Sequence, residues 1–164
     1  VGELISLANK HPRVNILNPG CGVGGHCISV DPWFIVDSAN GKAKMVEQAR
    51  KTNDYKSDWV VEKIKNSIFE FNKKYNRMPT LSCMGLAFKP NIDDLRESPA
   101  LYIAQELNKE FDIVAVEPYI EMHEVLNLVS LDIGIRSDIC IYLVAHDSFK
   151  AANVKNEDLV FCEL

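Results

Sequence analysis

The sequence predicts an α/β protein in which a Rossmann-like parallel sheet domain is preceded by a long central helix. After residue 79, short apolar runs alternate with helical segments, which is the pattern of a parallel sheet covered by helices on both faces. Before residue 79, the segment 42–75 contains no proline or glycine, and apolar residues recur in it at nearly every third or fourth position. A chain of 164 residues without a repeat suits one such domain plus an extension. We therefore expect a division into residues 1–78 and 79–164.

Composition narrows the class of protein. A formal net charge of −5 argues against nucleic acid or an anionic membrane as partner. No apolar run approaches the roughly 20 residues of a membrane-spanning helix, and no signal-peptide pattern is visible. Five cysteines without framework spacing indicate a reducing compartment, so we expect a cytoplasmic protein. Because the chain begins with Val1 rather than Met, we also expect it to be a piece of a longer protein.

The first elements are a helix and a glycine-rich loop. Residues 2–9 carry apolar side chains at helical spacing, and Pro12 ends that pattern just before Arg13. Residues 18–33 then read NPGCGVGGHCISVDPW, with four glycines in six positions, so the backbone can approach a ligand closely. Asp31 and Pro32 predict a helix start, with Asp31 as the N-cap. A thiol beside a helix start lies in positive potential that favours the thiolate, which makes Cys27 the candidate nucleophile.

The residues of this loop also allow other interpretations. Gly20, Gly22 and Gly25 spell the dinucleotide-binding fingerprint, but that motif needs a strand directly before it, and Pro19 stands there instead. Zinc ligation by Cys21, His26 and Cys27 lacks the usual ligand spacing, so no metal is expected. A structural glycine turn with incidental cysteines stays open.

The remaining elements follow in order. We expect a short helix over residues 32–39 and one long helix from Lys42 to about Tyr75, with a kinked pair of helices as the alternative. Apolar runs predict strands at 81–87, 112–116, 138–144 and 159–162, and helices at 99–110 and 120–128. Cys83, Cys140 and Cys162 fall in those strands and are interpreted as inert core. Lys89, Glu117 and His146 follow strand ends and so point to one rim of the sheet, where ligands of such sheets bind; His146 is given no catalytic role.

Two blocks of the chain resemble a known family. The loop with its continuation to Val36, and the block MGLAFKPNIDDLRESPA at residues 84–100, are similar to the UDP-glucose/GDP-mannose dehydrogenase family. The His-Cys and Asp-Pro-Trp-Phe versions of the first block most resemble the branch that acts on UDP-N-acetyl-D-mannosamine. The resemblance spans nearly the whole chain but only the rear part of such an enzyme.

The resemblance implies a two-step, NAD-dependent oxidation of a UDP-sugar alcohol to the acid. Cys27 would attack the intermediate aldehyde, because a bare aldehyde cannot release hydride until a nucleophile adds to it. Asp31 would be its acidic partner, with a simple helix cap as the alternative role. Arg96 would reach the cofactor phosphates. The alternative interpretation of the charged residues around Arg96 is a solvated loop. The implied substrate contacts are Arg13 (across a homodimer formed by the long helix), Gly22, Gly24, Gly25, Phe88 and Lys89.

The chain also departs from the family. It lacks the family's nicotinamide-binding domain, so we expect the polypeptide alone to be inactive. UDP-glucose, UDP-N-acetylglucosamine and GDP-mannose stay open as substrates. A non-catalytic nucleotide-binding or dimerisation module is the alternative of a different class.

Overall fold

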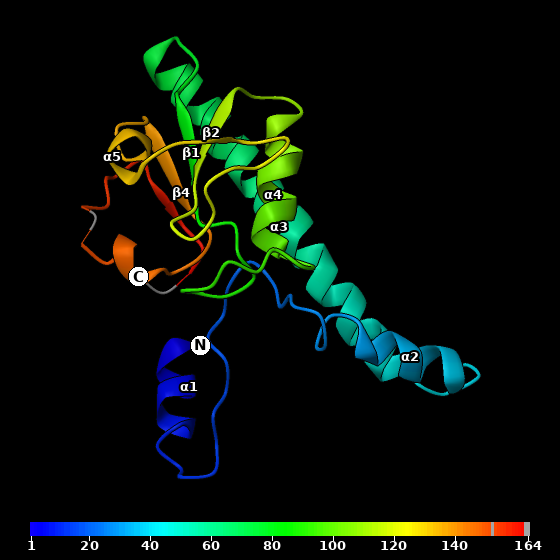
Figure 1. The fold of residues 1–164 in the computed structure, drawn as a ribbon. Coiled ribbons are helices and arrows are strands. Elements are labelled where there is room, and N and C mark those ends of the chain that lie inside the picture. Colours follow the sequence, from blue (N-terminus) through cyan, green and yellow to red (C-terminus); the bar gives the residue numbers. More distant parts are fainter. Residues whose placement is uncertain (152, 163–164) are drawn as a thin grey trace.

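The centre of the molecule is a parallel sheet. In a computed structural model, which describes residues 1–151 and 153–162, five described strands lie in the order β3-β2-β1-β4-β5 (Figure 1). Their bounds are β1 (Leu81–Met84), β2 (Ile113–Val116), β3 (Asn127–Leu128), β4 (Ile139–Tyr142) and β5 (Leu159–Val160). The chain builds outward from β1 through β2 to β3, then returns to the other side of β1 with β4 and β5. The strand order therefore reverses between β1 and β4.

Helices cover both faces of this sheet, as predicted. Helices α3 (Lys44–Tyr75) and α4 (Pro99–Asn108) lie on one face, and α5 (Leu131–Gly134) lies on the other (Figure 1). Alternate residues of β1 face opposite cores, because side chains alternate along a strand: Cys83 packs with Ile64 of α3, whereas Met84 packs with Phe149. The sequence prediction of an α/β fold with a long preceding helix is confirmed.

Helix α3 is one continuous helix of 32 residues rather than a kinked pair. Its C-terminal part buries Val60, Ile64, Ile68 and other residues at helical spacing against α4 and the sheet. It ends at Asn76, which adopts the left-handed conformation at φ 52° and donates its N–H to the Asn72 carbonyl at 2.7 Å.

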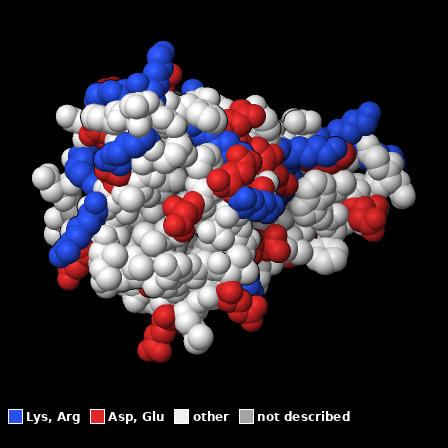
Figure 2. All heavy atoms as spheres, turned by 90° about the horizontal axis from the view of Figure 1, so that it is seen from above, with Lys and Arg blue, Asp and Glu red and all other residues white. Residues whose placement is uncertain are grey.

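The N-terminal part of α3 extends beyond the sheet and carries α2 (Asp31–Ser38) alongside it (Figure 1). Helix α1 (Gly2–Ala8) also lies away from the sheet. No side chain of α2 is buried within this chain. None of the described helices is both long and apolar enough to cross a membrane. Seen from above, acidic and basic side chains are interspersed over the surface (Figure 2).

Several predicted boundaries are wrong. Residues 120–128 form no helix, because His123 Nδ1 accepts the N–H groups of Val125 and Leu126 in a local turn and the chain then enters β3. The first strand stops at Met84 instead of residue 87, since Gly85 turns the chain at φ 89°. The last strand covers only residues 159–160.

Candidate functional site

A cleft of about 670 Å³ lies beyond the carboxyl ends of β1 and β4, where the strand order reverses. Reversal points of this kind are where parallel sheets bind ligands. One wall is the glycine loop over residues 17–24, and the other is formed by residues 87–91 after β1 and residues 143–147 after β4. The cleft therefore lies at the end of the sheet where the positions of the strand ends predict ligand binding.

The glycine loop is attached to α3 by hydrogen bonds between side chains of the helix and backbone groups of the loop. Asn53 Oδ1 accepts the Val23 N–H at 2.8 Å, while Asn53 Nδ2 donates to the Val23 carbonyl at 3.2 Å. One turn later, the Ser57 hydroxyl donates to the Cys21 carbonyl at 3.3 Å. This amide clamp satisfies both backbone groups of Val23 and fixes the loop relative to the helix.

Two positions of the loop accept only glycine. A side chain at Gly24 would collide with the Glu97 carbonyl oxygen and lie 2.8 Å from Pro99 Cδ. Gly25 adopts φ 90°, and a Cβ there would lie 2.9 Å from the Phe88 ring. The loop is therefore packed directly on the segment after β1, and the Gly25 N–H donates to the Arg96 carbonyl at 3.2 Å. The segment before the loop is irregular rather than a strand, which agrees with the argument against a dinucleotide fingerprint.

Cys27 lies at the turn that leads into α2. Its thiol is exposed, and its carbonyl accepts the Asp31 N–H at 2.8 Å, so Cys27 and Asp31 are one helical turn apart. The helix begins at Asp31 itself, with Val30 as N-cap and no side-chain cap, so the prediction of Asp31 as N-cap is wrong by one residue. Cys27 does not line the cleft, although the adjacent Ile28 does.

The other cysteines are shielded. Burial raises the pKa of the Cys83 thiol to about 12, and it also raises the pKa of Cys140. Cys21 and Cys162 line the cleft, but burial raises their pKa to about 12 and about 11 respectively. At neutral pH these four are thiols, and Cys27 is the exposed cysteine of the described chain.

Lys89 is the cleft-lining cation that the sequence predicted; Lys150 also lines the cleft but is paired with Asp147. Lys89 lines the cleft together with Phe88, and its Nζ lies 5.5 Å from the centre of the Phe88 ring. Its side chain is exposed and forms no ion pair within the described residues. Lys89 is therefore available to a ligand anion.

Arg96 and Arg13 lie outside the cleft. The Arg96 guanidinium binds both oxygens of Asp94, and these hydrogen bonds lower the pKa of Asp94 to about 2. They also raise the pKa of Arg96, to which Cys27 contributes a smaller electrostatic effect. Arg13 is exposed on the segment after α1, and within one chain the structure does not bring it to the cleft. The structure thus gathers Gly22, Gly24, Phe88 and Lys89 in the cleft, with Gly25, Cys27, Asp31 and Arg96 around the same loop.

Sequence reasoning missed two parts of the site. Asn53 sits in a polar stretch of an otherwise amphipathic helix, and that stretch was the only signal of a buried contact. Glu117 and His146 were expected at the rim but given no function; in the structure they form a buried pair with 3.2 Å between Glu117 Oε2 and His146 Nε2.

Comparison with known proteins agrees with this geometry. Residues 82–161 match the UDP binding domain of the UDP-glucose/GDP-mannose dehydrogenase family, and residues 1–55 match its central domain. UDP-N-acetyl-D-mannosamine dehydrogenases of Salmonella typhi and Campylobacter jejuni are 46% and 47% identical over 92% and 99% of this chain. The chain spans about two fifths of the length of these curated relatives, 39% and 41%.

Solved structures give the same result. A UDP-D-ManNAc dehydrogenase from Pyrococcus horikoshii superposes with a TM-score of 0.74 at 32% identity, covering 93% of this chain and 36% of that one. The UDP-N-acetyl-mannosamine dehydrogenase Cap5O from Staphylococcus aureus gives 0.67 at 35% identity, covering 93% and 34%.

Proposed function

Because this chain belongs to the UDP-glucose/GDP-mannose dehydrogenase family, we propose that it serves in an NAD-dependent UDP-sugar 6-dehydrogenase and that its cleft holds the UDP part of the substrate. The relatives named above favour UDP-N-acetyl-D-mannosamine as the sugar nucleotide, oxidised to UDP-N-acetyl-D-mannosaminuronic acid. In this proposal, residues 1–78 supply the reactive loop and the dimer contact, and residues 79–164 bind UDP.

The observation that carries this proposal is the cleft itself. It lies at the strand-order reversal, between a backbone-lined glycine loop and the unpaired Lys89. A diphosphate needs a cation, which Lys89 would supply from one wall, and the glycines of the other wall allow the backbone to approach it closely. Phe88 adds an aromatic face to the same wall.

Cys27 would provide covalent catalysis beside this cleft, next to Ile28, which lines it. Its thiolate sulfur adds to the carbonyl carbon of the substrate aldehyde, and the resulting hemithioacetal carries the hydrogen that leaves as hydride. The thioester that remains is cleaved by water, which releases the carboxylate and returns the thiol. In this proposal Asp31, one helical turn from Cys27, would accept a proton from that water.

The residues around the loop suit a dinucleotide. The Arg96 side chain is 63% exposed and stands beside the Cys27 loop, to which its backbone carbonyl is bonded through Gly25. In that position it would hold a cofactor pyrophosphate. NAD, when bound, would accept the hydride in each of the two oxidations.

A homodimer would complete the site. Helix α2 buries no side chain within one chain and exposes Phe34 and Ile35, while α3 exposes Tyr55 nearby. An apolar surface of this kind is typical of an interface. A second copy covering it is the arrangement in which Arg13 would reach the cleft of its partner.

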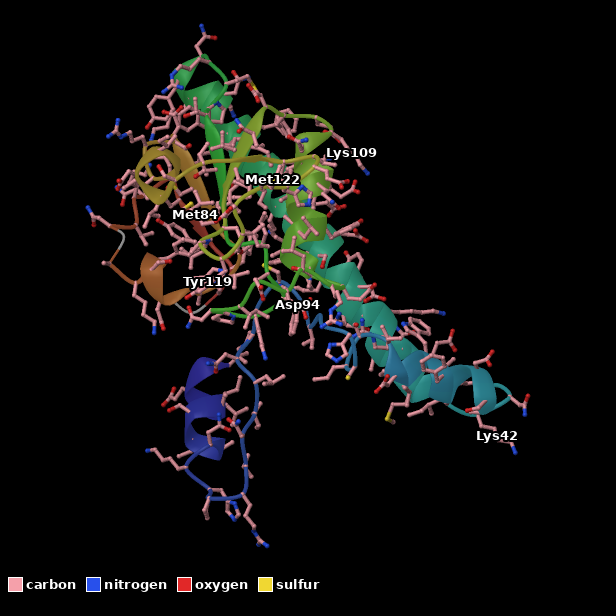
Figure 3. The ribbon with its side chains drawn as sticks, in the orientation of Figure 1. Lys42, Met84, Asp94, Lys109, Tyr119 and Met122 are labelled. Atoms are coloured by element: carbon pink, nitrogen blue, oxygen red, sulfur yellow. The ribbon has the colours of Figure 1, made fainter. Side chains whose placement is uncertain are left out.

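Binding of UDP by the purified chain tests the proposal. We expect UDP to bind by calorimetry, Lys89→Ala to weaken it at least tenfold, and Lys42→Ala, at the far tip of the α2–α3 arm (Figure 3), to leave it unchanged. We further expect UDP to slow alkylation of Cys27. Absence of binding, or equal effects of the two lysine variants, would refute the nucleotide site, and Cys27 labelling indifferent to UDP would favour a non-catalytic module.

A further inference from the structure

We propose that Glu117 and His146 are positioning residues for the nucleotide site, because they fix the loop of residues 88–91, and with it Lys89, through a hydrogen bond to Asn91. The ligand in this inference rests on the proposed function; the network itself does not.

Glu117 is a buried carboxylate with a full set of donors. Its Oε2 accepts the N–H groups of Leu86 at 2.7 Å and Ala87 at 3.1 Å and lies 3.2 Å from His146 Nε2, while Oε1 accepts the Tyr119 N–H at 3.2 Å. Burial alone would raise the pKa of Glu117, but the bonds from His146 and the two backbone N–H groups outweigh it and lower that pKa. Glu117 is therefore ionised, and it holds the chain as it leaves β1.

The hydrogen bonds of His146 define its tautomer. The ring is fully buried, and its Nδ1 accepts the Asn91 N–H at 2.9 Å. A nitrogen that accepts an N–H bond carries no proton, so the proton of the neutral ring is on Nε2, where it is donated to Glu117. The imidazole thus joins the carboxylate after β2 to the loop after β1.

Asn91 connects that loop to its surroundings. It adopts the left-handed conformation at φ 63°, which asparagine tolerates. Its Oδ1 accepts the Asp147 N–H at 3.0 Å and the Tyr119 hydroxyl at 3.2 Å, and its Nδ2 donates to Asp147 at 2.8 Å. Figure 3 shows Tyr119 at the same end of the sheet as Asp94, where the loop lies.

Lys89 is separated from this anchor by one residue. Pro90 has a fixed φ, which removes one of the backbone rotations between Lys89 and the anchored Asn91. At the other end, the Phe88 N–H is bonded to the Asp94 carbonyl at 3.2 Å. Residues 88–91 all line the cleft, and both ends of that wall are therefore anchored.

The chemistry of the pair favours positioning over simple stabilisation. Burying a carboxylate and an imidazole is costly, and a well-packed apolar pair would stabilise the core as well or better. An apolar pair could not orient the Asn91 N–H. The buried pair adds directional bonds to residues 86, 87, 91 and 119, and two of these residues, Ala87 and Asn91, line the cleft.

Two substitutions of the same residue separate the bonds. His146→Gln keeps a donor toward Glu117 and removes the acceptor for Asn91, whereas His146→Asn keeps an acceptor at the position of Nδ1. We expect both variants to lower Tm. His146→Gln should weaken UDP binding about tenfold, whereas His146→Asn should keep an affinity close to that of the wild type. Equal affinity changes in the two variants, or an unchanged affinity in folded His146→Gln, would overturn the inference.

Nuclear magnetic resonance of the same chains tests the network without UDP. We expect ¹⁵N shifts of His146 that report a proton on Nε2 only, and displaced, faster-exchanging amides at Lys89 and Asn91 in His146→Gln. A proton on Nδ1, or unperturbed amides, would refute positioning. If UDP fails to bind the wild-type chain while these signatures appear, the proposed function is wrong and the positioning network stands.

Discussion

Removal of the Asn53 clamp is the sharpest test of how α3 holds the glycine loop. Asn53→Ala deletes two hydrogen bonds to Val23, at 2.8 and 3.2 Å, and leaves the Val23 N–H and carbonyl without those partners. At about 0.5–1.5 kcal/mol for each bond, the loss is about 1–3 kcal/mol. Alanine is the better helix former by about 0.6 kcal/mol, which offsets part of it in global stability.

The larger effect is expected locally. If about 2 kcal/mol is lost from the attachment of the loop, conformations detached from α3 become about 30-fold more populated. We expect faster hydrogen exchange at the Val23 amide, weaker UDP binding, and less protection of Cys27 from alkylation by UDP. The unfolding temperature falls by about 2–4 °C for each kcal/mol of net stability lost, as measured by calorimetry.

Two further variants make this test specific. Thr52→Ala is the matched control, since it has a similar helix-propensity gain and removes two exposed bonds of the hydroxyl with Gln48 in the same helix, one donated to the Gln48 carbonyl and one accepted from Gln48 Nε2. Asn53→Asp retains an acceptor for the Val23 N–H and should fall between wild type and Asn53→Ala. If Asn53→Ala and Thr52→Ala show the same Val23 exchange and the same UDP affinity, the loop is not held by α3 and the reasoning fails.

The other predictions concern packing, thiol reactivity and pH. Ile64→Ala, at a fully buried position, should lower the free energy of unfolding by about 2–5 kcal/mol in denaturant titrations, and a loss below 1 kcal/mol would contradict the packing described. Iodoacetamide at neutral pH should label Cys27 first, with Cys83 labelled only after unfolding; mass spectrometry showing equal rates would refute this. The paired hydrogen bonds from Arg77, both at 2.7 Å, hold the pKa of Asp138 below its usual range, so this pair stabilises the fold above about pH 4 and its contribution is lost as the pH falls further. Asp138→Asn should therefore lower Tm at pH 7 and by a smaller amount at pH 3, with the difference shrinking further as the pH falls toward the folded-state pKa, and a constant difference would be inconsistent with that linkage.

The sequence predicted best what depends on local periodicity. The apolar spacing in α3 and the apolar runs of β1, β2 and β4 were sufficient to predict these elements, because each of them buries a regular set of side chains. Residues 120–128 show the limit. Their apolar residues also suit a helix, but the His123 turn and pairing of β3 with the sheet determine the outcome.

For the candidate site, the sequence predicted which residues take part better than it predicted the contacts between them. Lys89 and the glycines were identified from the loop pattern and the family resemblance, and the structure places Lys89, Gly22 and Gly24 in one cleft, with Gly25 beside it. The clamp on Val23 joins residues 30 positions apart, and the Glu117–His146 pair joins residues 29 apart. Such pairings depend on tertiary structure, so no local pattern announces them.

Helix α3 makes the width of the cleft a property of distant packing. One wall of the cleft is the glycine loop, which is hydrogen-bonded to Asn53 of α3. The other wall follows strands of the sheet against which Ile64 is buried. At 1.5 Å per residue, Asn53 stands about 16 Å from Ile64 along a rigid rod, so a 5° tilt about Ile64 displaces it by about 1.4 Å. A change of one methyl group where Ile64 packs would therefore act on the glycine-loop wall of the cleft through the tilt of α3, with no substitution in the cleft itself.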